Sequence, residues 1–214
     1  MKQKSFGFSL SEVLITLGVI GVVAAITLPV VINKTQTHIL KNQYKRVYSN
    51  YSNALQKYIV DNSIPDCYYG KNGISSNYTG CSEFFQDFMQ YFKYIKYCES
   101  NAFSNGCIPK YDSYCSKDGG CLGFSEDRVN TESKAWVLND GSSFICYNAN
   151  SKTCSMPLFQ VDINGKKAPN KGSYDLVAFS ISRYGDTLKL DISSCVPYSE
   201  GAIVKGSDIS GVYK

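Results

Sequence analysis

The first third of the chain changes from an unbroken apolar run to a regular alternation of apolar and polar positions. From Val13 to Ile32 the residues are apolar apart from a few small or hydroxyl side chains. A helix needs about 20 such residues to cross the hydrocarbon core of a bilayer, so this run predicts a membrane segment. From residue 33 to 61 apolar side chains recur every three or four positions, which predicts that the helix continues in water with one buried face. This apolar stripe consists of Leu40, Tyr44, Val47, Tyr51, Ala54, Leu55 and Tyr58.

Past the long helix the pattern predicts a second, shorter helix. Pro65 is expected to end the first one, because the residue before a proline leaves the α region. Ser82 is a candidate N-cap, and Glu83 and Asp87 follow it in the first turns, where acidic side chains are favourable. The buried face of this helix is expected to hold Phe84, Phe85, Phe88, Met89, Phe92 and Ile95.

The remainder of the chain predicts a sheet. Residues 98–123 are expected to be loops, and later apolar runs are separated by turn residues such as Asn139 to Ser142. Consecutive strands joined by short turns indicate an antiparallel meander, whose apolar face would pack on the stripe of the long helix. The predicted fold class is therefore α+β. The strands are expected at 135–138, 143–147, 158–163, 176–182 and 187–192.

Length and charge limit the classes of function. About 180 residues follow the membrane segment, enough for one domain with its own core. The net charge of +4 falls to +2 without Lys2 and Lys4, and no concentrated basic face is evident, so no nucleic-acid partner is expected. These two lysines place the N-terminus in the cytoplasm and the remainder of the chain outside, because basic residues are retained on the cytoplasmic side.

All nine cysteines lie beyond the membrane segment, which is typical of a disulfide-stapled domain in an oxidising compartment. There is no CxxC, and the one histidine, His38, is far from every cysteine in sequence, so a zinc site is not expected. The odd number leaves at least one thiol free or bonded between chains. Pairing cannot be read from the sequence; guesses from short spacing are Cys67–Cys81, Cys107–Cys121 and Cys146–Cys154.

Glu12 is the one carboxylate at the start of the apolar run. A charge at the centre of a membrane helix costs about 2.5–3.5 kcal/mol, less near the interface, so such a residue usually serves a function with a partner. If the chain is cut between Gly7 and Phe8, Glu12 becomes the fifth residue of the mature chain. Its carboxylate can then neutralise the new α-amino group of a neighbouring helix and set the register between subunits.

A short basic leader, the Gly7/Phe8 junction, Glu12, the long apolar helix and Pro29 occur together in residues 1–29. This segment closely resembles the signal of type IV pilins and type II secretion pseudopilins. The resemblance implies a pilin-like fold, cleavage after Gly7 and methylation of the Phe8 amine by a membrane prepilin peptidase. It also implies that the helix is first a membrane anchor and then the core of a filament, with Pro29 where the helix bends or loosens on assembly.

The interpretation is thus a structural subunit without enzymatic activity or cofactor. Its expected partners are a prepilin peptidase, other pilin or pseudopilin subunits and an assembly platform in the cytoplasmic membrane. Its expected location is the cytoplasmic membrane, with the head outside, and later a pilus or pseudopilus. The expected domains are a leader at 1–7, a transmembrane and assembly helix at 8–32, its amphipathic continuation at 33–62 and a Cys-rich globular head at 63–214.

Other interpretations remain open. The segment can be a plain signal anchor, or a secretory signal cut after Ala25, but Glu12 and the helical pattern beyond residue 25 argue against both. The motif does not separate pilus, secretion and competence systems, or major from minor subunits. A Cys-rich binding module, as in a tip adhesin or a competence minor pilin, would be favoured by an exposed aromatic patch. The candidates for that patch are Tyr68, Tyr69, Tyr111 and Tyr114.

Two further features concern chemistry. The run from Asp162 to Asn170, with Asp175 after it, suggests a calcium loop, and some pseudopilins do hold calcium near the end of their sheet. It lacks the closing Glu of an EF-hand and contains Lys166 and Lys167, so an Asn-Gly hairpin turn is favoured and no metal site is assigned. Motifs of the common hydrolases and nucleotide-binding enzymes are missing, so no catalytic residue is assigned.

Overall fold

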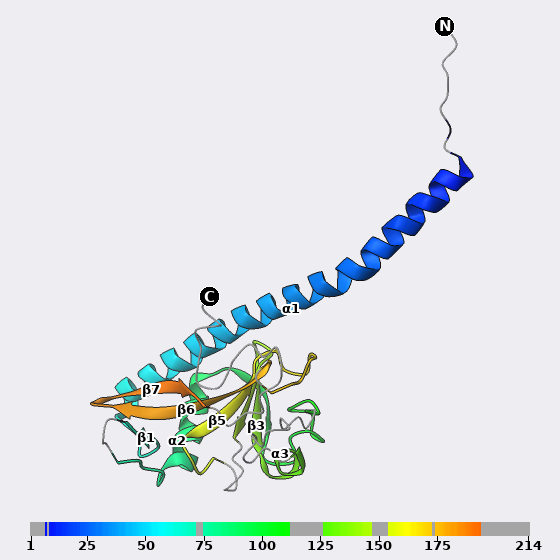
Figure 1. Cartoon of the computed structure of the whole chain (residues 1–214). Coiled ribbons are helices and arrows are strands. Elements are labelled where there is room, and N and C mark those ends of the chain that lie inside the picture. The colour runs from blue at the N-terminus through cyan, green and yellow to red at the C-terminus, as the bar shows by residue number, and fades with distance from the viewer. Residues whose placement is uncertain are drawn as a thin grey trace. The chain divides into compact units, whose positions relative to one another are not determined.

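The computed structural model describes residues 7, 9–71, 75–111, 126–146, 154–172 and 174–193. Residues 1–39 and 40–214 form two compact units. Helix α1 (Leu10–Asn62) is assigned without a break and contributes residues to both units (Figure 1). The second of these, residues 40–214, is called the C-terminal unit below.

In the N-terminal unit the apolar side chains of α1 have no protein neighbours to bury them. The exposed fraction of the large ones ranges from 43% at Val13 to 82% at Leu10. By length and composition, α1 is the one helix among the described residues that can cross a membrane. Its threonines are compatible with lipid, because each hydroxyl donates to a carbonyl of the preceding turn; Thr27 Oγ1, for example, is 2.9 Å from the oxygen of Val23. The prediction of a transmembrane helix is confirmed.

The C-terminal unit contains a seven-stranded sheet, most of which is an antiparallel meander. Each strand from β2 to β6 pairs antiparallel with the next one in the chain. The exception is β1, which pairs parallel with β6. It does so beyond the end of β5, because β5 pairs with β6 only as far as Ser180, whereas Tyr69 of β1 pairs with Ser182. The strands are β1 (Tyr69–Gly70), β2 (Tyr94–Cys98), β3 (Lys134–Leu138), β4 (Ser143–Cys146), β5 (Leu158–Asp162), β6 (Leu176–Tyr184) and β7 (Thr187–Ile192).

The second half of α1 packs on this sheet through its apolar stripe. Tyr51 lies at the centre, with its ring 5.6 Å from that of Phe159 and 6.0 Å from that of Phe144. Helix α2 (Cys81–Phe88) and the 3-10 turn η1 (Met89–Tyr91) supply more aromatic side chains to the same core. All stripe positions are buried except Ala54, which is half-buried. The α+β, pilin-like fold class is confirmed, and so is the packing of the stripe on the sheet.

Several details of the fold differ from the prediction. Ser82 does not cap α2, because Gly80 is the N-cap and no side chain caps the helix. Ile95 is 73% exposed, since the chain becomes extended at Phe92 and leaves the helical face on which Ile95 was expected. The predicted loop region begins with a residue of β2, and a short helix, α3 (Glu126–Glu132), precedes β3.

Among the described residues, three disulfides staple the C-terminal unit: Cys67–Cys81, Cys98–Cys107 and Cys146–Cys154. The first and the third agree with the guesses from spacing. The predicted pair Cys107–Cys121 is not formed, because Cys107 is bonded to Cys98 at the end of β2. The other three cysteines, Cys115, Cys121 and Cys195, lie outside the described residues.

Gly165 allows the loop after β5 to approach the turn between β3 and β4. It has a φ of +65°, and a Cβ there would lie 2.2 Å from the carbonyl oxygen of Gly141. Gly185 has a similar φ of +60°, but nothing lies within 4 Å of its Cβ position. Gly185→Ala should therefore lower the free energy of unfolding by about 1 kcal/mol through backbone strain alone. Gly165→Ala should cost about 2 kcal/mol more, because of the added clash.

Both variants can be measured by urea unfolding of the full chain in detergent, followed by the fluorescence of Trp136, the one tryptophan, which lies in the core. Equal costs for the two variants would contradict the close approach at Gly165.

Candidate functional site

Gly7 lies at the start of the described chain, just before α1. It is exposed, and a Cβ built on it would meet nothing within 4 Å. No φ in the left-handed region is found at this position either. The described part of the fold therefore gives no steric reason for a glycine here, and a role of Gly7 in processing stays a prediction from the sequence. Phe8, its expected partner in processing, lies outside the described residues.

Glu12 and Ser9 form a capping box at the start of α1. The backbone N–H of Ser9 and its hydroxyl both donate to Glu12 Oε2, at 2.8 and 2.9 Å. In return, the backbone N–H of Glu12 lies 3.3 Å from Ser9 Oγ. These bonds satisfy donors that the first turn of a helix leaves unpaired. This second use of Glu12 was not predicted from the sequence, although the pattern Ser-x-x-Glu at the start of an apolar helix signals it.

The capping box leaves part of the Glu12 carboxylate available. Among the described residues, every hydrogen bond to this carboxylate goes to Oε2. The side chain is exposed. Oε1 can therefore still accept a hydrogen bond from a further donor, such as an amine, without loss of the cap.

The other candidate positions lie further along α1. The helix continues through Pro29, which has no N–H to donate to the carbonyl of Ala25. Gly18 and Gly21 have open space at their Cβ positions. Pro29 is about 26 Å from Glu12 along the helix axis, at 1.5 Å per residue. Glu12 and Pro29 therefore do not form one site but two separate points on an exposed apolar helix.

The comparisons with known proteins decide the interpretation of this segment. Residues 2–28 match the family model of the prokaryotic N-terminal methylation motif. This motif is the signature of type IV pilins and pseudopilins. No match was found to a curated protein or to a solved structure. The matched segment contains Gly7 and Glu12 and ends one residue before Pro29.

The match confirms the resemblance stated from the sequence. It gives the chain the N-terminal segment of a prepilin-like substrate, and the apolar helix that begins within this segment is suited to a membrane anchor. Proteins with this signature are structural and not catalytic.

The candidate calcium segment folds as a loop whose carboxylates already have protein donors. Asp162 Oδ2 accepts a 2.9 Å hydrogen bond from the hydroxyl of Tyr111, and Oδ1 accepts one of 3.2 Å from the backbone of Asn164. Asp175 accepts two of 2.6 Å from the backbone N–H groups of Asn170 and Lys171. The connection between β5 and β6 occupies residues 163–175, so the prediction of a tight Asn-Gly hairpin turn is wrong. The two strands do form an antiparallel pair.

Asp162 and Asp175 should make the stability of the C-terminal unit depend on pH. Both carboxyls are buried, and burial raises the pKa of each. The charge of Asp175 raises the pKa of Asp162 further, although hydrogen bonds from Tyr111 and the loop backbone oppose these effects. A raised pKa means that the folded state holds the proton more tightly than the unfolded chain does. The stabilising contribution is thus complete below the unfolded pKa of about 4 and is lost as the pH rises through the folded pKa.

We expect Asp162→Asn to flatten this fall in stability, because an amide carries no titrating proton and keeps an acceptor for Asn164. The measurement is the urea midpoint from acid to neutral pH, again by Trp136 fluorescence. The matched control is Asp186→Asn, in the exposed turn between β6 and β7, which should leave the pH profile unchanged. A parent-like profile for Asp162→Asn would contradict the assignment.

The aromatic patch that would have favoured a binding module is not formed by the tyrosines named for it. Tyr68 and Tyr111 are buried, and Tyr69 is half-buried. Tyr114 lies outside the described residues.

Proposed function

We propose that the chain is a structural prepilin-like subunit, cleaved after Gly7 and N-methylated at Phe8 by a prepilin peptidase. The mature subunit then assembles into a type IV pilus or a type II secretion pseudopilus, and it has no catalytic activity of its own. The observation that carries this proposal is the methylation motif at residues 2–28, which contains most of the exposed apolar part of α1.

The exposed face of α1 supports assembly as well as anchoring. A helix with unburied apolar side chains over some twenty residues must be covered by lipid or by other helices. Gly18 and Gly21, with open space around them, allow the close approach of a neighbouring helix. The partners in this proposal are other pilin or pseudopilin subunits and the assembly platform in the cytoplasmic membrane.

Orientation and domain roles follow from the same proposal. Residues 1–7 form the leader, 8–32 the membrane and assembly helix, and 33–62 the amphipathic continuation that carries the globular head at 63–214. The basic leader stays in the cytoplasm and the head is extracytoplasmic. The three disulfides of the C-terminal unit support an oxidising compartment for the head.

Two residues of α1 have roles in assembly. Glu12 pairs with the N-terminal amine of the neighbouring subunit, for which Oε1 remains available. Pro29 weakens the helix at one point, since it removes a backbone hydrogen bond, and so allows local loosening during packing. Both roles belong to the filament and not to the isolated chain.

The test is the N-terminus of the mature protein, determined by intact-mass and peptide mass spectrometry in cells with and without the prepilin peptidase. We expect N-methyl-phenylalanine at Phe8 when the peptidase is present, and the uncut chain when it is deleted. A mature chain that starts at Ile26 or Thr27 would contradict the proposal and indicate a secreted protein. An uncut chain in peptidase-containing cells would indicate a plain signal anchor.

A binding module at a filament tip is a second candidate function. It is favoured by one observation, an open pocket beside α1 in the C-terminal unit.

A further inference from the structure

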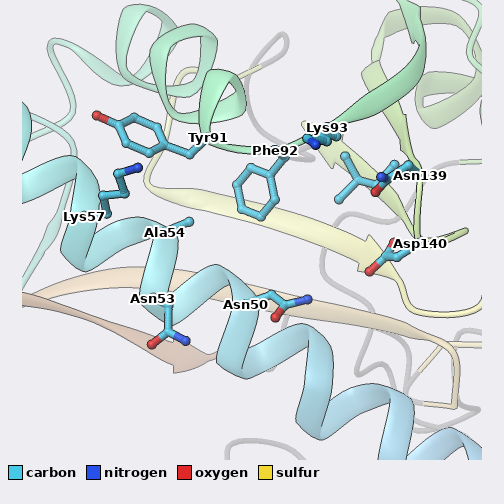
Figure 2. Close-up of a pocket in the computed structure, with 10 residues that line it drawn as sticks. Asn50, Asn53, Ala54, Lys57, Tyr91, Phe92, Lys93, Asn139 and Asp140 are labelled. Atoms are coloured by element: carbon cyan, nitrogen blue, oxygen red, sulfur yellow. The ribbon is translucent and has the colours of Figure 1, made fainter.

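The C-terminal unit contains an open pocket of about 380 Å³ between α1 and the start of the sheet. Lys57, Ala54 and Asn50 of α1 line one side, and Phe92 faces them from the segment between η1 and β2 (Figure 2). Asn139 and Asp140, from the turn after β3, close one end. Its volume falls within the range of about 300–1,000 Å³ that is usual for small-ligand sites.

The lining contains two lysines, Lys57 and Lys93, and the carboxylate of Asp61 lies beside it on the hydroxyl of Tyr91. The one carboxylate of the lining itself, Asp140, is already engaged: Oδ1 accepts hydrogen bonds from the backbone and hydroxyl of Ser142, at 3.0 and 2.6 Å, and Oδ2 lies 3.8 Å from the guanidinium of Arg46. In contrast, Lys57 and Lys93 make no ion pair with any described residue. The ammonium of Lys57 lies 5.7 Å from the ring centroid of Tyr91. Two ammonium groups are therefore available for an anion.

One wall of the pocket is aromatic and held in place. The hydroxyl of Tyr91 accepts a 2.8 Å hydrogen bond from Asn62 and donates one of 3.0 Å to Asp61, both at the end of α1. The ring of Phe92 lies 4.6 Å from that of the buried Tyr51. Rings that are fixed before binding lose little freedom when a ligand packs on them, so this wall is preorganised. Its half-buried faces suit the apolar C–H face of a pyranose ring.

Side-chain amides supply the remaining polar groups. Asn50 and Asn139 are exposed, and within the described ranges neither amide makes a hydrogen bond. Each amide offers both a donor and an acceptor, which matches the hydroxyl groups of a sugar.

We propose that this pocket binds an acidic sugar residue of the uronic-acid type. Its carboxylate pairs with the ammonium groups of Lys57 and Lys93, its ring packs on Tyr91 and Phe92, and its hydroxyls bond to Asn50 and Asn139. A nucleic acid fits less well, because the pocket lacks the continuous basic surface that a phosphate backbone requires. An acidic peptide would leave the aromatic wall without a matching planar face. This inference goes beyond the proposed function and does not depend on it, since it rests on the C-terminal unit alone.

The test is a ligand titration of the purified full chain by saturation-transfer NMR, in a detergent without a sugar headgroup. The probes are digalacturonate and its neutral counterpart, a galactose disaccharide. We expect digalacturonate to bind and the neutral disaccharide to bind more weakly. Each of the single variants Lys57→Gln and Lys93→Gln should bind digalacturonate about fivefold more weakly, because each loses one exposed ion pair.

The matched control is Lys189→Gln. The ammonium of Lys189 also lies over a tyrosine ring, 5.4 Å from the centroid of Tyr184, but outside this pocket. Its loss should leave binding of digalacturonate unchanged.

The proposal is overturned if digalacturonate does not bind, or if the neutral disaccharide binds equally well. Parent-like affinity in both pocket variants, or an equal loss in Lys189→Gln, would overturn it too. Tighter binding of tetraglutamate or of oligodeoxythymidine through the same lysines would also overturn it, and would indicate a peptide or a nucleic acid as the ligand of this pocket. None of these outcomes bears on cleavage after Gly7, which is measured at the N-terminus.

Discussion

Replacement of Tyr51 by alanine is expected to lower the free energy of unfolding of the C-terminal unit by about 3–5 kcal/mol. Tyr51 is 1% exposed and lies where α1, α2 and the sheet meet. Its ring centroid is 4.6 Å from that of Phe92 and 5.6 Å from that of Phe159. Alanine would leave a cavity among rings that are already packed and cannot close around it. The measurement is urea unfolding of the full chain in detergent, followed by Trp136 fluorescence.

Two further variants separate the contribution of the ring from other effects. The hydroxyl of Tyr51 is buried and has no hydrogen-bond partner among the residues that the structure describes. Tyr51→Phe should therefore leave stability unchanged or raise it by about 1 kcal/mol, since it removes an unsatisfied polar group. Val60→Ala, on the same helix but 84% exposed, should change stability by less than about 0.5 kcal/mol. If Tyr51→Ala lowered the free energy of unfolding no more than Val60→Ala, the packing of Tyr51 in the aromatic core would be contradicted.

The parts of the fold that the sequence predicted well are those with a strong local period. The stripe on α1 is read directly from its spacing of three and four residues, and each of its positions is at least half-buried. The strands from β3 to β7 alternate or run apolar between clear turn residues, such as Gly141 and Gly185. Both glycines have positive φ values, so the turns lie where the sequence places them.

The missed elements are held in place by contacts distant in sequence. Strand β2 is an edge strand with one buried residue, Cys98, so its sequence shows no apolar alternation. Strand β1 has two residues and pairs with β6, more than a hundred residues later. Disulfide pairing depends on such placement as well, because Cys107 could be assigned to Cys98 only once β2 was known. No local pattern carries this information.

The candidate sites also divide into those with a local sequence pattern and those formed by residues distant in sequence. Gly7, Glu12 and the apolar helix belong to a local motif and were found in the sequence. The pocket was not, because Lys57, Phe92 and Asp140 come from three segments that only the fold brings together. The capping box is the exception: Ser9 and Glu12 are three residues apart, but the expected role of Glu12 in the filament hid its local role.

Glu12→Gln distinguishes the two interactions available to Glu12, and it is expected to abolish filament assembly if the proposed function holds. Glutamine can still close the capping box, because its side-chain oxygen accepts from Ser9 as the carboxylate does. It cannot neutralise the N-terminal amine of a neighbouring subunit. Removal of one partner of a buried pair costs about 3–5 kcal/mol, which corresponds to a loss of more than about a hundredfold in each subunit contact.

The complementary variant is Ser9→Ala, which removes the serine hydroxyl from the cap but keeps the charge of Glu12. It should cost about 1 kcal/mol of helix stability and leave assembly intact. The measurement is the amount of subunit in sheared and pelleted filaments relative to the amount in the membrane, with cleavage after Gly7 checked by mass spectrometry in every variant. Normal assembly of Glu12→Gln together with a defect in Ser9→Ala would mean that Glu12 acts as a cap and not as a charge. The opposite pattern would assign its role to the contact between subunits, because the cap is then dispensable and the charge is not.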